Sequence, residues 1–76
     1  MSWNAKEQAQ MRYVTEHLNE VLAVTHELEI RLDESTERVT VHGIGKKEAL
    51  LTVNVGDDSP RGFLEDVMQG INSLYE

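Results

Sequence analysis

Residues 25–33 read Thr-His-Glu-Leu-Glu-Ile-Arg-Leu-Asp, and within them the hydrophobic period of the chain changes. Before this stretch, apolar residues recur about every 3.6 positions, as on one face of an amphipathic helix. Within it, apolar and charged residues alternate, as in a strand with one buried and one solvated face. The expected inward residues are His26, Leu28, Ile30 and Leu32. The sequence therefore predicts a helix that ends near Val24 and a strand over roughly residues 25–33.

The residues on the N-terminal side predict a helix over about residues 4–24. Asn4 and Glu7 have the spacing of a capping box, in which each side chain bonds the backbone N–H of the other residue. The apolar stripe of this helix consists of Trp3, Met11, Val14, Leu18, Val21 and Leu22. Tyr13 and Val24 lie outside the stripe, and with Leu50 they would form the core of an interface if the fold gathered them together.

The residues on the C-terminal side predict two further strands and a second helix. A strand over about residues 38–42 points Val39 and Val41 inward, and its outward residues are Arg38, Thr40 and His42. A strand over about residues 48–55 has the inward set Ala49, Leu51, Val53 and Val55. Its outward set is Leu50, Thr52 and Asn54.

The second helix is expected over about residues 60–75, with Ser59 as its N-cap and Pro60 in its first turn. A wide apolar stripe predicts that this helix packs against both the sheet and the first helix. The stripe consists of Phe63, Leu64, Val67, Met68, Ile71, Leu74 and Tyr75. Gly70 borders the stripe, where the lack of a side chain allows a neighbouring segment to approach closely.

Short connections between the three strands favour an antiparallel meander. Because every strand has one apolar face, both helices are expected on that face. The predicted fold is an α+β two-layer sandwich of order αβββα, built as a single domain over residues 1–76.

The formal net charge of −7 restricts the partners that we expect. Seven cationic side chains against fourteen anionic ones give no basic surface for nucleic-acid phosphates or anionic membranes. The charge favours a partner protein with a basic surface, although acidity can also serve solubility alone. The chain has no cysteine, its first residues are unlike a signal peptide, and it lacks an apolar run of roughly 20 residues. We therefore expect a cytoplasmic protein without membrane spans.

The stretch Gly-Ile-Gly-Lys-Lys-Glu-Ala at residues 43–49, together with the αβββα order, resembles part of the double-stranded-RNA-binding domain. In that family, the lysine pair opens the final helix. Here Lys46 and Lys47 lead into the third predicted strand, and the net charge has the wrong sign for phosphate binding. The sequence therefore does not predict RNA binding.

The sequence has no pattern typical of a catalytic or metal site. The histidines fall on different predicted elements, without the spacing that places two ligands on one metal ion. The neighbouring carboxylates fall on solvated faces and at a helix start, rather than in a cleft that separates their pKa values. No serine follows the pattern of a nucleophile elbow. We therefore expect no enzyme activity and no cofactor.

Two features favour protein binding. The third strand is expected at an edge of the sheet, and the stretch from Leu50 to Val55 has no proline or lysine to protect it from pairing. The candidate binding residues are therefore Leu50, Thr52 and Asn54 on this strand and the acidic residues Glu16, Glu20, Glu27, Glu29, Asp57 and Asp58.

The leading hypothesis is a small acidic protein-binding module that inhibits or regulates a partner protein. A narrower version is nucleic-acid mimicry, because small phage-encoded inhibitors, including some anti-CRISPR proteins, are similar in size, acidity and mixed α/β build. The alternative is a homodimeric assembly or chaperone-like module that pairs through the third strand.

Overall fold

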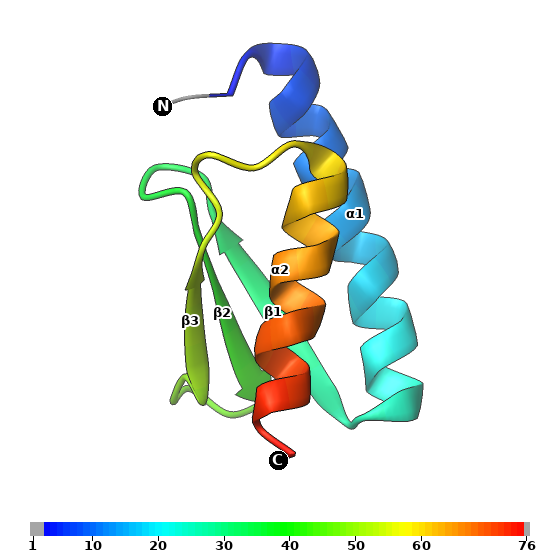
Figure 1. Cartoon of the computed structure of the whole chain (residues 1–76). Helices are drawn as coiled ribbons and strands as arrows, with labels where there is room; N and C mark the ends of the chain where they lie inside the picture. Colours follow the sequence, from blue (N-terminus) through cyan, green and yellow to red (C-terminus); the bar gives the residue numbers. More distant parts are fainter. Residues whose placement is uncertain (1–2, 76) are drawn as a thin grey trace.

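The order αβββα is confirmed by the computed structural model, which describes residues 3–75 (Figure 1). Helix α1 (Ala5–Thr25) is followed by the strands β1 (Leu28–Asp33), β2 (Arg38–Gly43) and β3 (Leu51–Asn54), and then by helix α2 (Pro60–Ser73). The strands form one antiparallel sheet in the order β1-β2-β3. Of the predicted domain over residues 1–76, the two N-terminal residues and Glu76 lie outside the described residues.

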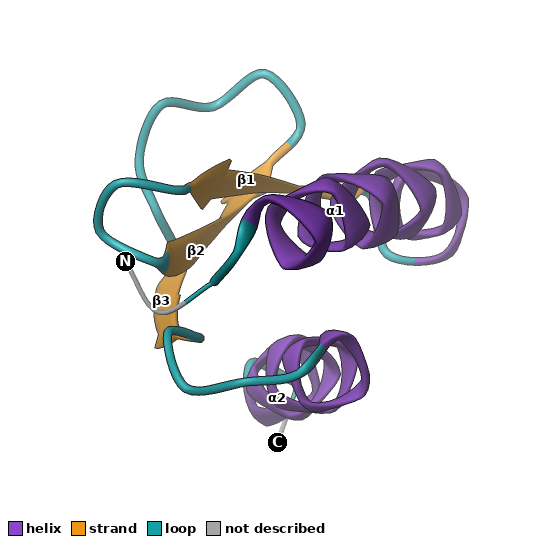
Figure 2. Cartoon of the chain, turned by 90° about the horizontal axis from the view of Figure 1, so that it is seen from above, coloured by secondary structure: helices purple, strands orange, loops and turns teal. Residues whose placement is uncertain are grey.

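Both helices lie on one side of the sheet, α1 beside β1 and α2 beside β3 (Figure 2). The register pairs Ile30 with Val41 and Val41 with Leu51, so inward residues of all three strands stand in rows under the helices. The buried core consists of Trp3, Met11, Leu18, Leu22, Leu28, Ile30, Val39, Val41, Val55, Phe63, Val67 and Ile71. Most of the predicted inward residues are therefore confirmed.

Both helix starts follow from local side chains. The predicted capping box is present: the Asn4 side chain accepts from the Glu7 N–H at 2.8 Å, and Glu7 accepts from the Asn4 N–H at 3.2 Å. At α2, the Ser59 hydroxyl accepts from the Gly62 N–H at 3.3 Å, and Pro60 occupies the first turn. Such caps satisfy backbone groups that have no partner within the helix.

The predicted strand start at Thr25 is wrong. α1 continues to Thr25, and the His26 N–H bonds the Leu22 carbonyl at 3.0 Å, so His26 caps the helix instead of facing the core from the sheet. Glu27 then has φ 56°, the left-handed conformation that commonly ends a helix. β1 begins only at Leu28, because the chain must first turn back along α1.

The predicted extent of β3 and the exposure of His42 are also wrong. Residues 48–50 are outside the strand, and Ala49 is exposed. The segment 44–50 folds onto the outer sheet face, where Arg31 donates to the Lys46 carbonyl and Glu29 accepts from the Gly45 N–H. His42 does point outward, but it is only 4% exposed, and its ring nitrogens contact the Glu48 carbonyl at 3.1 Å and the Thr40 hydroxyl at 2.7 Å.

Gly70 permits the close approach of α2 to β3 that the sequence suggested. A Cβ atom built on Gly70 would lie 2.7 Å from Leu51 Cδ2 and 3.1 Å from Val53 Cγ2. Both distances are shorter than ordinary carbon–carbon contacts, so a side chain here would require the methyl groups of Leu51 and Val53, or the helix itself, to shift. The glycine therefore accommodates the close packing of α2 against the strand at the sheet edge.

Candidate protein-binding surface

An apolar groove lies between the outer surfaces of α1 and α2. One part is a hollow of about 250 Å³ lined by Tyr13, Val14, His17, Leu18, Val21 and Leu64. A second hollow, of about 430 Å³, is lined by Lys6, Ala9, Gln10, Tyr13, Val14 and Pro60. The two hollows share Tyr13 and Val14, so they lie next to each other along α1, and we call the pair the interhelical groove.

The groove corrects part of the predicted core. Val21 and Leu64 were expected in the buried stripes, yet they are 55% and 41% exposed. In a fold of two layers, the seam between the helices on the side away from the sheet has no third layer to cover it. Leu74 and Tyr75 are exposed as well, because α2 ends at Ser73.

The α1 wall of the groove has its own stripe, separate from the stripe that faces the core. Tyr13, His17 and Val21 follow one another at intervals of four residues, which places them on one helix face. The Tyr13 ring is exposed to 63% and meets the His17 ring edge-on, with 4.2 Å between the ring centroids. Val24 continues the stripe beyond the groove lining, and Leu50 lies at the opposite face of the sheet, so the three residues Tyr13, Val24 and Leu50 do not form one cluster.

One candidate carboxylate on α1 contacts the groove wall. Glu16 and Glu20 are both exposed on this helix, and Glu20 Oε2 lies 3.7 Å from His17 Nδ1 in the groove wall. The nearby arginines are engaged with other carboxylates: Arg61 pairs with Glu65 at 3.1 Å, and Arg12 pairs with Glu34 at 3.3 Å. Glu20 therefore places a negative charge beside this wall of the groove.

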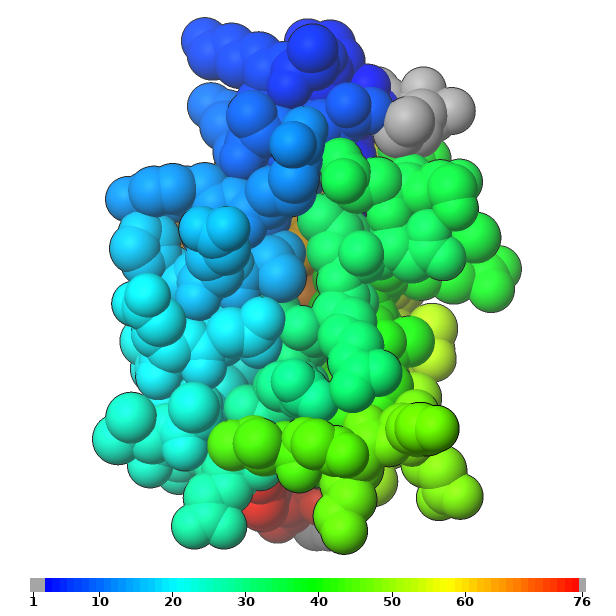
Figure 3. All heavy atoms as spheres, turned by 180° about the vertical axis from the view of Figure 1, so that it is seen from behind, coloured from blue at the N-terminus to red at the C-terminus, as the bar shows by residue number. Residues whose placement is uncertain are grey.

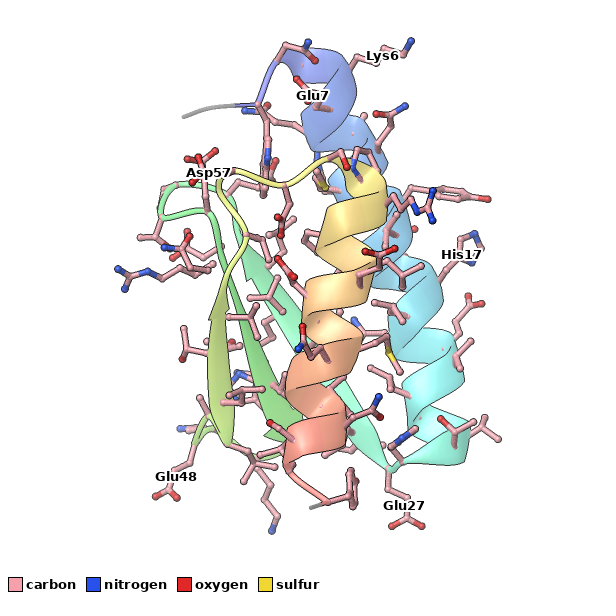
Figure 4. All side chains as sticks on the ribbon, viewed as in Figure 1. Lys6, Glu7, His17, Glu27, Glu48 and Asp57 are labelled. Atoms are coloured by element: carbon pink, nitrogen blue, oxygen red, sulfur yellow. The ribbon has the colours of Figure 1, made fainter. Side chains whose placement is uncertain are left out.

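The other candidate carboxylates lie elsewhere, so the six do not form one strip. Figure 4 shows Glu27 at the end of the molecule where α1 stops and Asp57 at the opposite end, while His17 projects from the outer side of α1. Glu29 lies on the outer sheet face, paired with Arg31 at 2.9 Å. The hydrogen bond from Arg31 and another from the Gly45 N–H lower the pKa of Glu29, although desolvation opposes them.

The carboxyl groups of Asp58 and of Asp66 in α2 lie next to each other. Burial, a hydrogen bond with Asp66 and the charges of Asp66 and Asp57 raise the pKa of Asp58 to about 6. Asp58 Oδ2 is buried without a hydrogen-bond partner when the carboxyl is ionised, and the Asp58 carbonyl accepts from Trp3 Nε1 at 3.2 Å. The segment before α2 is therefore packed into the fold and serves its structure.

The predicted edge at β3 has an uncovered outer side within residues 3–75. β3 bonds β2 on one side only, and Leu50, Thr52 and Asn54 are exposed as expected. The other sheet edge differs, because Asn19 of α1 donates to the Ile30 carbonyl at 3.0 Å and accepts from the Ile30 N–H at 2.7 Å. The β1 edge is therefore occupied at Ile30, whereas among residues 3–75 no strand pairs with the outer side of β3.

A view of the molecule from behind shows α1 beside the green residues of the sheet, with the segment 44–50 lying across the lower end (Figure 3). No group of three metal-binding side chains occurs among the residues that the structure describes. Within the same part of the chain, no helix is long and apolar enough to cross a membrane.

No family model matches the chain, and neither a curated protein nor a solved structure matches it.

Proposed function

We propose that this protein is a small acidic protein-binding module that inhibits or regulates its partner through the interhelical groove. The observation that carries the proposal is the exposure of Tyr13, Val21 and Leu64 side by side along the groove. Isolated exposed apolar residues are common, but a contiguous apolar depression is typical of an interaction site. A small domain without a catalytic site of its own would regulate a partner protein by covering a surface that the partner needs for its activity.

The nucleic-acid-mimicking version has less support from the geometry. A mimic needs carboxylates spaced along one surface, whereas Glu27 and Asp57 lie at opposite ends of the molecule. Glu29 is already neutralised by Arg31. Of the candidate carboxylates, Glu20 accompanies the groove through its contact with His17, so we assign it to electrostatic attraction of the partner.

A homodimeric assembly module is the second candidate, and the open edge of β3 favours it. Antiparallel pairing of β3 with its copy would extend the sheet across two chains. The strand is only four residues long, so pairing would give few hydrogen bonds. Like charges on two chains of −7 would also oppose the contact.

Matched variants separate these candidates. Val21 and Leu50 are 55% and 56% exposed, on α1 and beside β3, so Val21→Asp and Leu50→Asp make the same chemical change on two surfaces. Each tagged protein is used to capture proteins from native-host cells, and the captured proteins are quantified by mass spectrometry. We expect a protein that the wild type and Leu50→Asp retain and that Val21→Asp loses.

Loss of the captured protein with Leu50→Asp, and retention with Val21→Asp, would transfer the function to the β3 edge. Equal capture by all three proteins, or no capture beyond that of an unrelated acidic control protein, would contradict the proposal. We expect both variants to fold, because surface substitutions of this kind change the free energy of unfolding by about 0.5 kcal/mol or less. Circular dichroism of each variant checks this.

A further inference from the structure

We propose that the occupant of the interhelical groove is a basic amphipathic α-helix of a partner protein. This inference rests on the proposed function and specifies the partner's chemistry. It follows from three properties of the groove: the absence of backbone hydrogen-bonding groups in its walls, its length and its charge.

The walls of the groove decide the secondary structure of the occupant. They are side chains of α1 and α2, and the backbone groups within these helices already bond each other. An extended peptide would bring unpaired N–H and C=O groups against Val14, Val21 and Leu64, which costs free energy. A helix bonds its own backbone, so it can present apolar side chains alone.

The length of the groove fits a helix of several turns. The lining residues on α1 run from Lys6 to Val21. At a rise of about 1.5 Å per residue, this distance is roughly 22 Å, or about four turns of a third helix. Such a helix would rest between α1 and α2 as a ridge in a groove, with its apolar face on Tyr13 and Leu64.

Charge favours a basic helix over a second copy of this chain. Glu20 stands on α1 beside His17 of the groove wall, and Arg12 and Arg61 are paired with other carboxylates. A second copy would bring the same carboxylate and a net charge of −7 toward the groove. A helix with lysine or arginine beside its apolar face would instead meet charges of opposite sign.

Lys6 gives the groove a polarity. It lies at the far end, in the first turns of α1, and Figure 4 shows it near the end of the molecule opposite Glu27. The basic residues of the occupant are therefore expected over the half of the groove that contains His17 and Val21, beside Glu20.

Fluorescence anisotropy with labelled peptides of about 15 residues tests the proposal on the whole chain. One peptide has leucines on one helical face and lysines on the other. A second has the same composition in an order that scatters the leucines around the helix, and a third has glutamate in place of lysine. We expect the first peptide to bind at least about tenfold more tightly than either control.

The groove variants then locate the binding. Val21→Asp adds a negative charge, which would strengthen a purely electrostatic contact, so at least about tenfold weaker binding would identify the apolar groove. Glu20→Lys should weaken binding by about threefold at low salt, whereas Glu48→Lys makes the same charge change at a distant loop and should have a smaller effect.

Equal binding of the ordered and scattered lysine peptides, or undiminished binding to Val21→Asp, would overturn the inference. That result would be distinct from failure of the proposed function, because capture of a cellular protein that depends on Val21 would still show the groove to be a binding site for a different ligand. If Val21→Asp changed neither peptide binding nor the capture of a cellular protein, the results would contradict both this inference and the proposed function.

Discussion

Replacement of Asp58 by asparagine should stabilise the protein at neutral pH and leave its stability nearly unchanged at pH 4. Burial and the adjacent Asp66 carboxyl raise the pKa of Asp58 from 3.8 to about 6, which means that the fold favours the protonated form. Below pH 3.8, the group is protonated in the folded and the unfolded chain, and the fold carries no penalty from its ionisation. Between pH 3.8 and about 6, only the folded chain retains the proton, so stability falls as the pH rises.

The size of the effect follows from the pKa difference. A difference of roughly two pH units corresponds to about 3 kcal/mol for a group shielded from water. Asp58 is half-buried, and screening by water reduces this value, so we expect a gain of about 1 kcal/mol for Asp58→Asn at pH 7. The asparagine keeps the shape of the side chain, and its amide group can donate to Asp66, as the protonated carboxyl does.

Urea unfolding at several pH values, followed by the fluorescence of Trp3, measures this gain. Trp3 is the only tryptophan, is buried, and packs edge-on against Phe63, so its emission reports on the folded core. Other groups also make stability depend on pH; the lowered pKa of Glu29, for example, makes the free energy of unfolding fall in acid. These contributions are common to the variant and the wild type, so they cancel when the two free energies of unfolding are subtracted at each pH.

Asp57→Asn is the matched control, because it removes one negative charge from the neighbouring residue. We expect its gain to be less than half of that for Asp58→Asn. A gain for Asp58→Asn that is the same at pH 4 and pH 7, or no gain at pH 7, would refute the explanation in terms of the Asp58 carboxyl.

Three further predictions concern the fold. Asn19→Ala should destabilise the protein by about 1–3 kcal/mol in urea unfolding, because the Ile30 N–H and carbonyl both lose their partner; a loss well below this would show that water replaces the amide. Gly70→Val should lower the free energy of unfolding by about 1–3 kcal/mol through contact with Leu51 and Val53. Gly62→Ala is the control and should have little effect, because a Cβ atom there meets only ordinary contacts. Equal effects of the two substitutions would show that the approach of α2 to β3 is not tight. Asn4→Ala should lower stability by about 1 kcal/mol by removing the capping box, and an unchanged melting temperature would contradict this.

The inward and outward positions within the strands were predictable because strand parity is a local property. Ile30, Val39 and Val41 are buried as the alternation predicted, and the helix starts at Asn4 and Ser59 follow from side chains within one turn. His26 was misassigned because a helix end and a strand start can have the same short alternation of apolar and charged residues. The left-handed conformation of Glu27, which separates the two, has no signature in the side-chain pattern.

The features that the sequence did not predict depend on contacts between distant segments. The burial of His42 requires the segment 44–50 to bond Glu29 and Arg31, and no periodicity describes such a loop. The interhelical groove likewise depends on the number of layers. Val21 and Leu64 have the helical spacing of core residues, and only the packing of two helices on a single sheet decides that they stay exposed.

One signal of the groove was present in the sequence. Tyr13, His17 and Val21 follow one another at intervals of four, and Val24 comes one turn later. This second stripe on α1 is separate from the stripe of Met11, which faces the core. The intervals of four residues could therefore have identified the exposed stripe of α1 from the sequence.

Amide chemical-shift mapping of the isotope-labelled chain, titrated with the leucine–lysine helical peptide, tests the interhelical groove most directly. The proposal predicts that the largest shifts lie along one side of α1 and the facing part of α2, at Tyr13, Val21 and Leu64, with small changes at Thr52 and Asn54. Largest shifts along β3, or shifts spread evenly over all acidic residues, would contradict it.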